Sequence, residues 1–448
     1  MPLMDLLHYD SQPTHVVGII GGAVAGSEAA ALVAEKGAIA VVFEQGARPY
    51  GKIEDGLPRW HDKLRQKEYE RIDANLSREG VFFVPNTKVG EDVQLATLCK
   101  EYGLSAILLA NGAWRDRPLP IEGIDAYVGR GLLYQNPFVY WFNHYHEAGY
   151  RGPQYEVLDR AIVVGGGLAS VDVVKVINLE LYAAALRKLG HEIDITELEV
   201  KGIPKICEDH GVDPASLGIH GATLYYRRSM EEMPVATADD PTPEQLAKLK
   251  VARVKIMERV MRKYLVHFEG NAAPAGAIVE DGRLVGLRFD RTEVVDGRVR
   301  TVAGAGFDVR APLVISSIGS VPEPIAGIPT RGELYDYADW KTGAVRERQG
   351  IFGLGNVLTG QGNIKDSRQN AMEITAQVAS DFLGVGEGAD GGTRGRVSVN
   401  VEPAVEAALH GRWLDAAAVR KVGAFVAARH ADIGYTDYAS WMAAHRAE

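Results

Sequence analysis

The chain has 448 residues, of which 46% are hydrophobic and 24% are charged, and its 59 acidic and 49 Lys or Arg residues give a formal net charge of −10. This length exceeds one ordinary hydrophobic core, so we expect two or three domains, and the composition excludes a chain that is mainly disordered or fibrous. The acidic balance argues against a protein that binds nucleic acid, which would carry a basic excess.

The cysteines and the N-terminal stretch indicate the cellular compartment. Cys99 and Cys207 lie too far apart for a CxxC redox pair, and two thiols are too few for a four-thiolate iron–sulfur or zinc site, so we expect reduced structural thiols and no metal. The first residues lack the basic and apolar regions of a secretory signal, and no apolar run reaches the roughly 18 residues of a membrane span. These features predict a cytoplasmic protein that binds neither membrane nor nucleic acid.

The first part of the chain has the pattern of a βαβ unit. An apolar run over 15–20 precedes a glycine-rich turn, Gly21-Gly22-Ala23-Val24-Ala25-Gly26, and a helix is predicted over 27–36. A strand predicted over 38–43 ends at Glu44. Glycines at such a turn let the backbone approach a pyrophosphate at the helix N-terminus, and the carboxylate can bind a ribose hydroxyl. We interpret the turn as a dinucleotide site; the alternative is a tight turn without a ligand.

A second βαβ pattern begins at residue 161. Its turn has the sequence Gly165-Gly166-Gly167-Leu168-Ala169-Ser170, followed by a helix predicted over 171–189 and a strand predicted over 222–226. Two dinucleotide turns in one chain indicate a flavoprotein with one site for FAD and one for a nicotinamide dinucleotide. Arg227-Arg228 at the end of the strand favours NADPH, because NAD sites usually place an acidic residue there.

The remaining elements are predicted from turn signals and apolar runs. Hairpins are expected at the Asp-Gly pairs 281–282 and 296–297, strands over 313–320 and 350–353, and helices over 248–264 and 368–382. A glycine-rich linker over 384–395 precedes a helical tail that carries aromatic residues. We expect this tail to cover the preceding domain or to bind a partner.

Five segments, in order along the chain, carry a family resemblance. They are EGVFFVPNTKVGEDV (79–93), LLANGAW (108–114), FVYWFN (138–143), LYYRRSMEEMP (224–234) and VISSIGS (314–320). Together they resemble the adrenodoxin (ferredoxin)–NADP reductase and glutamate synthase small subunit group of FAD-dependent, NADPH-oxidising enzymes. The resemblance implies an α/β fold with two Rossmann-like domains. A discontinuous FAD domain (13–128 and 321–385) would be interrupted by an NADPH domain (129–320, with a helical insertion at 178–221), and a C-terminal helical extension would follow at 396–448.

The resemblance also implies which residues hold the two cofactors. FAD would be held by Gly21, Gly22, Ala23, Gly26, Glu44, Gln45, Gly51, Lys52, Ala110, Asn111, Gly112, Gly355, Asn356, Gly362, Asn363 and Ile364. NADPH would be held by Gly165, Gly166, Gly167, Leu168, Ala169, Arg227, Arg228 and Glu232, although Glu232 could equally be a solvated acid. Three departures leave the flavin environment open: Ala23 replaces a glycine, Tyr50-Gly51-Lys52 replaces Gly-Gly-Leu, and Asn356 replaces an Asp or Trp.

Two further features bear on chemistry and docking. His61 falls where adrenodoxin-type reductases carry a histidine near the flavin, which implies a proton-handling or docking role; a surface histidine is the alternative. A local basic run could dock an acidic ferredoxin or could be a solvated face. The run consists of Lys52, Arg59, Lys63, Arg65 and Lys67.

The implied function is an FAD-dependent NADP(H):ferredoxin oxidoreductase. It would move a hydride from NADPH to FAD and then single electrons to a ferredoxin or another one-electron carrier. Two alternatives stay open. One is the flavoprotein subunit of a larger oxidoreductase complex, like the glutamate synthase small subunit, and the other is a flavin-binding protein without turnover.

Overall fold

A computed structural model of the chain describes residues 3–238, 240–360, 363–385 and 413–446. These residues form two compact units. The first unit contains the described parts of 1–54, 63–115 and 320–448, and the second contains Asp55–Asp62 and Asp116–Gly319. Within the described ranges, none of the helices has the length and apolar character needed to cross a membrane.

The first unit is built on a seven-stranded sheet with the order β17-β18-β19-β4-β1-β2-β3. The five strands from β19 to β3 are parallel, and β17 and β18 add an antiparallel edge. The central strands are buried aliphatic runs, which is typical of a parallel sheet covered on both faces. The strands are β1 (Val16–Ile20), β2 (Ile39–Phe43), β3 (Val81–Val84), β4 (Ala106–Leu109), β17 (Tyr337–Asp339), β18 (Ala344–Val345) and β19 (Ile351–Gly353).

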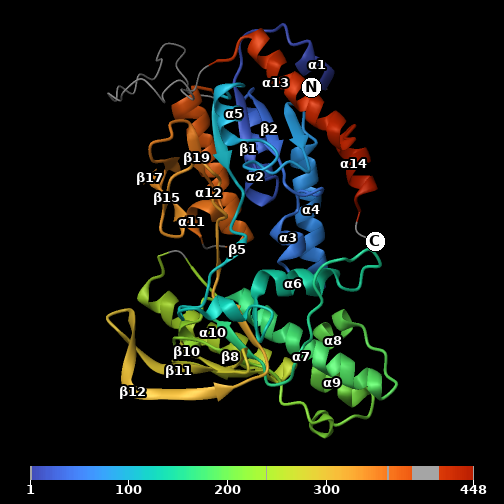
Figure 1. Ribbon diagram of the computed structural model, residues 1–448, viewed down its shortest axis with the longest axis vertical. Helices are drawn as coiled ribbons and strands as arrows, with labels where there is room; N and C mark the ends of the chain where they lie inside the picture. Colours follow the sequence, from blue (N-terminus) through green and yellow to red (C-terminus); the bar gives the residue numbers. More distant parts are fainter. Residues whose placement is uncertain (1–2, 239, 361–362, 386–412, 447–448) are drawn as a thin grey trace. The chain divides into compact units, whose positions relative to one another are not determined.

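Helices cover the first sheet, and two of them come from the C-terminal part of the chain. Alanine-rich α2 (Val24–Glu35) follows β1 and packs against α12 (Ile364–Gln377), which continues into the π-helix η5 (Val378–Leu383). The C-terminal helices α13 (Ala416–Ile433) and α14 (Tyr438–Ala444) add buried residues to the same core, and α13 lies beside α1 (Leu3–Leu7) (Figure 1). The shorter helices are α3 (Lys52–Asp55), α4 (Asp62–Leu76), α5 (Leu95–Lys100) and α11 (Asn356–Thr359).

The second unit contains a fully parallel five-stranded sheet with the order β6-β13-β7-β8-β9. Its strands are β6 (Leu132–Tyr134), β7 (Ile162–Gly165), β8 (Thr223–Tyr225), β9 (His267–Glu269) and β13 (Val314–Ser317). Its helices are α6 (Gln135–His144), α7 (Leu168–Lys188), α8 (Ile195–Lys201), α9 (Ile203–Asp209) and α10 (Pro243–Tyr264), with 3-10 turns η1 (Arg59–His61), η2 (Ile124–Tyr127), η3 (Pro214–Leu217) and η4 (Met230–Glu232).

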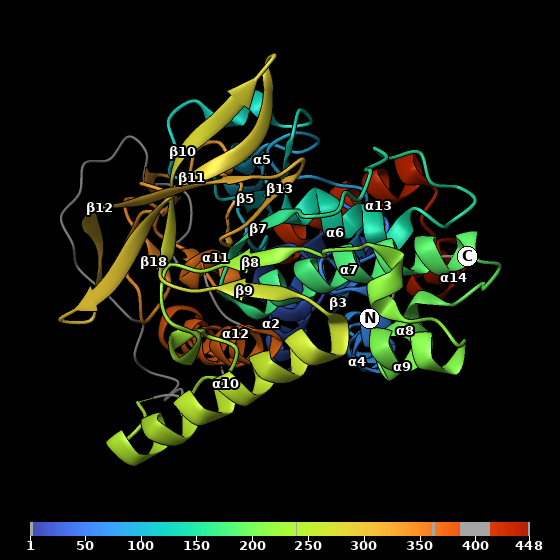
Figure 2. The ribbon, with the colours of Figure 1, turned by 90° about the horizontal axis from the view of Figure 1, so that it is seen from below.

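A separate three-stranded antiparallel sheet completes the second unit. It consists of β10 (Ala272–Glu280), β11 (Arg283–Val295) and β12 (Arg298–Arg310), whose long strands are drawn in yellow in Figure 2. Asp281 and Asp296 both adopt the left-handed backbone conformation at its two hairpins, as the Asp-Gly pairs predict. The short strands β5 (Arg115–Asp116), β14 (Ser320–Val321), β15 (Thr330–Arg331) and β16 (Leu334–Tyr335) lie in connecting segments.

Three boundaries differ from those expected from the sequence. The chain enters the second unit after Arg115 instead of near 128, because Leu119 and Ile124 are buried in the core of that unit. Residues Asp55–Asp62 also belong to the second unit, since Trp60 is buried among its side chains. The described part of the C-terminal extension shares the core of the first unit. The predicted linker beyond residue 385 and the first part of the predicted extension, from 396 to 412, lie outside the described residues.

Candidate functional site

The predicted FAD residues of the first unit come together at one edge of its sheet. The turn after β1, Glu44 after β2, Ala110-Asn111-Gly112 after β4 and Gly355-Asn356 after β19 all follow the carboxyl ends of parallel strands. Backbone hydrogen bonds continue past the strand ends, from Gly21 N to Phe43 O (2.8 Å) and from Ala110 N to Ile20 O (2.9 Å). This edge is where open α/β sheets bind their ligands.

Glycine is required at two positions of the first turn for different reasons. Gly21 has φ of 99°, and a Cβ atom there would lie 2.5 Å from the carbonyl oxygen of Ala110. A Cβ atom on Gly26 would overlap the carbonyl oxygen of Gly21, so this glycine lets α2 begin directly against the turn. The turn therefore brings the first N–H groups of α2 to the sheet edge, where they can bind a phosphate.

Glu44 is held in place by the backbone of the site itself. Its carboxylate is 7% exposed and accepts hydrogen bonds from Gly22 N (2.8 Å) and Gly46 N (2.9 Å). These two hydrogen bonds fix the side chain of Glu44 next to the turn. A carboxylate in this position can accept hydrogen bonds from ribose hydroxyls.

Two buried amides at the same edge have unused acceptors. The side-chain oxygens of Asn111 and Asn356 are buried and have no hydrogen-bond partner within the described residues. The amide nitrogen of Asn111 reaches Glu323 O and Tyr335 OH, both at 3.4 Å. Because buried polar atoms in proteins are nearly always paired, these two oxygens fit a ligand that supplies donors.

The other residues predicted for FAD lie around this edge with varied exposure. Gly51 lies against Ala23, whose methyl group would be 3.0 Å from a Cβ atom on Gly51. Lys52 donates a hydrogen bond to Ser320 Oγ (3.0 Å), while Gln45 is exposed. Asn363 caps α12 by accepting a hydrogen bond from Asp366 N (3.0 Å), directly before Ile364. Gly362 lies outside the described residues.

The second turn differs from the first in what covers its glycines. A Cβ atom on Gly165 would overlap the carbonyl oxygen of Ser317, and one on Gly166 would overlap the ring of Tyr226. Gly167, the N-cap of α7, has open space where a side chain would be. Leu168 and Ala169 are exposed in the first turn of this helix. The open backbone at Gly167 can therefore approach a pyrophosphate.

The arginine pair after β8 has two different environments. Arg228 donates to Glu232 Oε1 (3.1 Å) and to the carbonyl oxygen of Gly297 (2.9 Å). Arg227 is exposed, and its guanidinium has no ion-pair partner in the part of the chain that the structure describes. Glu232 also closes a capping box with Ser229 at the start of η4, so this acid has a structural role beside the arginines.

Two residues outside the predicted set of cofactor-binding residues complete this region. Tyr226 covers Gly166 and donates a hydrogen bond from its hydroxyl group to Glu232 O (3.3 Å). Arg253, on α10, donates to Ala236 O (2.9 Å) and Glu231 O (3.1 Å) and so ties α10 to η4. The sequence shows Arg253 only as one of several basic residues on an amphipathic helix, and this pattern carries no sign of its contacts.

His61 belongs to the second unit. Its Nε2 atom lies 3.4 Å from Asp172 Oδ2 on α7, next to buried Trp60. Arg59, two residues before His61, donates its backbone N–H to Asn143 Oδ1 (3.0 Å). The FVYWFN segment of α6 therefore holds the 3-10 turn that contains His61. The basic run is divided between the units, and its members in the first unit include Arg65, which donates to Tyr69 OH (3.0 Å). The expected position of His61 near the flavin stays a prediction.

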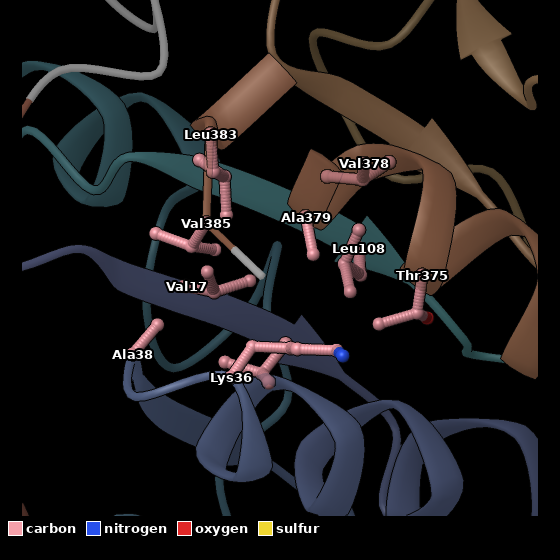
Figure 3. A pocket seen from close by; sticks show the side chains of 10 residues that line it. Val17, Lys36, Ala38, Leu108, Thr375, Val378, Ala379, Leu383 and Val385 are labelled. Atoms are coloured by element: carbon pink, nitrogen blue, oxygen red, sulfur yellow. The ribbon is translucent and has the colours of Figure 1, made fainter. Parts of the chain in front are cut away.

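The pocket drawn in Figure 3 is not part of either turn. Aliphatic side chains of β1, α2, β4 and the helix end at 378–385 line it, together with Thr375 and the stem of Lys36. It has no room for a water-sized molecule, so it is a packing gap between the sheet and its helices.

Two sheets with parallel cores, each with a glycine turn between one strand (β1 or β7) and the helix that follows it, define a protein with two Rossmann-like dinucleotide-binding domains. The predicted fold class is confirmed. The structure of Mycobacterium tuberculosis FprA in complex with NADPH superposes with a TM-score of 0.62 at 19% identity, covering 82% of this chain and 84% of that chain.

Sequence comparison gives named relatives. Glutamate synthase [NADPH] small chain of Mycobacterium tuberculosis is 24% identical over 370 residues, which are 77% of this chain and 62% of that protein. NADPH-Fe(3+) oxidoreductase subunit beta of Geobacter sulfurreducens is 25% identical over 343 residues, which are 74% of this chain and 40% of that protein. No family model matches. The predicted resemblance to the adrenodoxin-type reductase and glutamate synthase small subunit group is confirmed, and the chain matches less than two thirds of these relatives' length.

Proposed function

We propose that the chain is an FAD-dependent oxidoreductase that takes a hydride from NADPH and passes single electrons to a ferredoxin-type acceptor. The observation that supports this most directly is the pair of glycine turns, each at the carboxyl edge of its own parallel sheet. The names of two relatives also include NADPH. FAD bound at the first turn would accept the hydride and release electrons one at a time, which is chemistry that the flavin itself supplies.

The residues of the first unit would bind and orient FAD. The start of α2 would hold the pyrophosphate, and Glu44 would accept hydrogen bonds from the adenosine ribose. The buried oxygens of Asn111 and Asn356 would accept hydrogen bonds from donor groups of the flavin half. Gly355, with φ of 66°, lets α11 begin close to α2, because a Cβ atom there would lie 2.8 Å from Ala25 Cβ.

The residues of the second unit would bind NADPH. Gly167 and the first turn of α7 would hold its pyrophosphate, and Arg227 and Arg228 would bind the 2′-phosphate. Tyr226 and Arg253 would position these arginines through η4. A carboxylate faces Arg228 already, so Arg227 is the more available cation of the two.

Thiol chemistry has no part in this proposal. Burial raises the pKa of Cys99 to about 11 and raises the pKa of Cys207, so both stay protonated thiols near neutral pH. Cys99 belongs to the first unit and Cys207 to the second, which agrees with two separate structural residues. We place the protein in the cytoplasm, where such thiols stay reduced.

A second candidate is the flavoprotein subunit of a larger oxidoreductase. The relatives named as a small chain and as subunit beta favour it. In that case electrons would leave to a partner subunit instead of to a free ferredoxin. A stoichiometric protein that co-purifies with the chain would favour this candidate.

Anaerobic titration of the purified protein with NADPH tests the proposal. We expect one FAD per chain, no stoichiometric iron, and bleaching of the flavin absorbance by one equivalent of NADPH. Subsequent transfer to ferredoxins would identify the acceptor class. FMN in place of FAD, or flavin that NADPH does not reduce, would contradict the proposal.

A further inference from the structure

The C-terminal helices contact the loop that follows Glu44. Trp441 on α14 is 6% exposed, and its indole N–H donates a hydrogen bond to the carbonyl oxygen of Ala47 (2.7 Å). Ala47 lies in the segment that leads from Glu44 to Tyr50 and Gly51. A residue of the last helix therefore fixes the backbone beside the ribose-binding carboxylate.

A second contact joins α14 to the same loop through one carboxylate. Tyr438 OH donates to Asp73 Oδ1 (2.7 Å), and Tyr50 OH donates to both carboxylate oxygens of Asp73 (3.1 Å each). Tyr50 also stacks on Tyr69 with ring centroids 3.9 Å apart. Asp73 thus holds Tyr438 and Tyr50 together, at the far end of the loop from Glu44.

A third set of contacts reaches the end of β3. His430 Nε2 donates to Phe83 O (2.7 Å), and the ring of Phe83 lies 5.3 Å from that of Tyr438. The Phe83 ring is also next to Gly22, since a Cβ atom on Gly22 would lie 3.4 Å from it. Phe83 therefore contacts both the glycine turn and α14.

The same helices support the segment after β3 that pairs with Glu44. Arg429 donates to Thr87 Oγ1 (3.1 Å), and Thr87 N donates to the carbonyl oxygen of Glu44 (2.8 Å). Asn86 N donates to Gly46 O (3.1 Å). Residues 44–50 are thus bonded both to the segment that follows β3 and, at Ala47, to α14.

We propose that α13 and α14, residues 416–444 and here called the C-terminal clasp, retain the adenosine end of the dinucleotide bound at the first turn. The clasp would do so by fixing residues 44–50 and 83–87, which surround Glu44. This inference rests on the proposed binding of FAD at that turn. It assigns positioning roles to Trp441, which bonds to the loop directly, and to Tyr438, which reaches Tyr50 through Asp73.

Different residues of the clasp anchor it to the core and position the loop. Apolar residues of α13, such as Val419, Val422 and Val426, are buried in the core of the unit and anchor the clasp. The indole N–H of Trp441 and the hydroxyl group of Tyr438 instead bond to the loop and to Asp73. Removing these two donors should therefore loosen the loop while α13 stays packed.

The test compares release of FAD from the full-length wild type with that from Trp441→Phe, Tyr438→Phe and the double variant. Flavin fluorescence after dilution reports dissociation, and thermal unfolding is followed with and without FAD. We expect Trp441→Phe to release FAD about five- to tenfold faster, because it loses a hydrogen bond between neutral groups. Tyr438→Phe should release FAD about ten- to hundredfold faster, because its hydroxyl group bonds to a carboxylate. The FAD-free protein should lose some stability, because both bonds are made without FAD, but the gain in melting temperature on FAD binding should also shrink. The NADPH affinity should change little.

Trp413→Phe is the matched control. Trp413 precedes α13, is 55% exposed and contacts His15 instead of the loop, so this variant should release FAD like the wild type. Equal rates of FAD release from all variants, or an equal loss of stability with and without FAD, would overturn the proposed role of the clasp. Neither result would affect the proposed function. A wild type that binds no FAD would overturn the proposed function itself.

Discussion

The guanidinium of Arg228 lies 3.1 Å from the carboxylate of Glu232, whereas the neighbouring guanidinium of Arg227 is exposed. Two adjacent arginines are therefore not equivalent. A phosphate that binds Arg228 must compete with Glu232, and one that binds Arg227 meets no such competition within the described residues. The two positions should make different contributions to cofactor preference.

We predict that Arg227→Ala weakens the binding of NADPH more than Arg228→Ala does. Loss of a charged hydrogen bond at a solvent-exposed site costs about 1–2 kcal/mol, so the Michaelis constant for NADPH should rise about five- to thirtyfold. The double variant should lose the preference for NADPH over NADH. Steady-state kinetics with NADH are the internal control, since NADH has no 2′-phosphate, and an equal loss with both cofactors would contradict the assignment.

We predict that Arg253→Ala raises the Michaelis constant for NADPH about three- to tenfold. Arg253 bonds to two carbonyl oxygens next to η4, each bond being worth roughly 1 kcal/mol, and so orders the segment that carries Glu232. Lys248→Ala is the matched control, because Lys248 lies on the same helix and pairs only with exposed Glu244 in the described structure. If both variants behave alike, Arg253 has no positioning role.

The glycine turns and their carboxylate could be predicted because the signal is local. Six consecutive residues from Gly21, an apolar run before them and Glu44 after the next strand are sufficient to indicate this geometry. The Asp-Gly hairpins are predictable for the same reason, since the left-handed conformation is chosen within the turn itself.

Other features depend on contacts between distant parts of the chain. The hydrogen bond between Trp441 and Ala47 joins residues almost four hundred positions apart, and no periodicity in the sequence indicates it. The packing of Trp60 into the second unit has the same cause. The second glycine turn could be predicted, but the packing of the Tyr226 ring on its Gly166 could not.

His144 provides a prediction about pH. Its Nε2 atom lies 3.1 Å from Asp55 Oδ1, and its Nδ1 atom lies 2.8 Å from Glu147 Oε1. Burial alone would lower the pKa of His144, but the hydrogen bonds to the two carboxylates outweigh burial and raise this pKa above its usual value. The folded state therefore keeps a proton that the unfolded chain releases near pH 6.5.

The contribution of His144 to stability should be fully present below about pH 6.5 and should be lost as the pH rises through the raised folded-state pKa. Thermal unfolding of the wild type and of His144→Gln between about pH 6 and pH 9 would check this. The wild type should have its largest advantage at the acidic end, and the two curves should converge at the alkaline end. A difference that stays constant with pH would show that the imidazole contributes only by packing.

Gly167→Ala separates the structural role of the second turn from its role in binding. Gly167 has φ of −88°, which any residue adopts, and a methyl group there would meet no atom within 4 Å. The substitution should therefore leave the FAD content unchanged and keep or slightly raise the melting temperature, because alanine restricts the unfolded chain more than glycine does. The methyl group would nevertheless stand on the backbone surface that a pyrophosphate must approach, so the Michaelis constant for NADPH should rise at least about tenfold, equivalent to about 1.4 kcal/mol. NADH should be affected to the same extent, because the two cofactors share the pyrophosphate, and this parallel loss distinguishes Gly167→Ala from Arg227→Ala. Unchanged kinetics with both cofactors would show that the pyrophosphate does not bind at this turn.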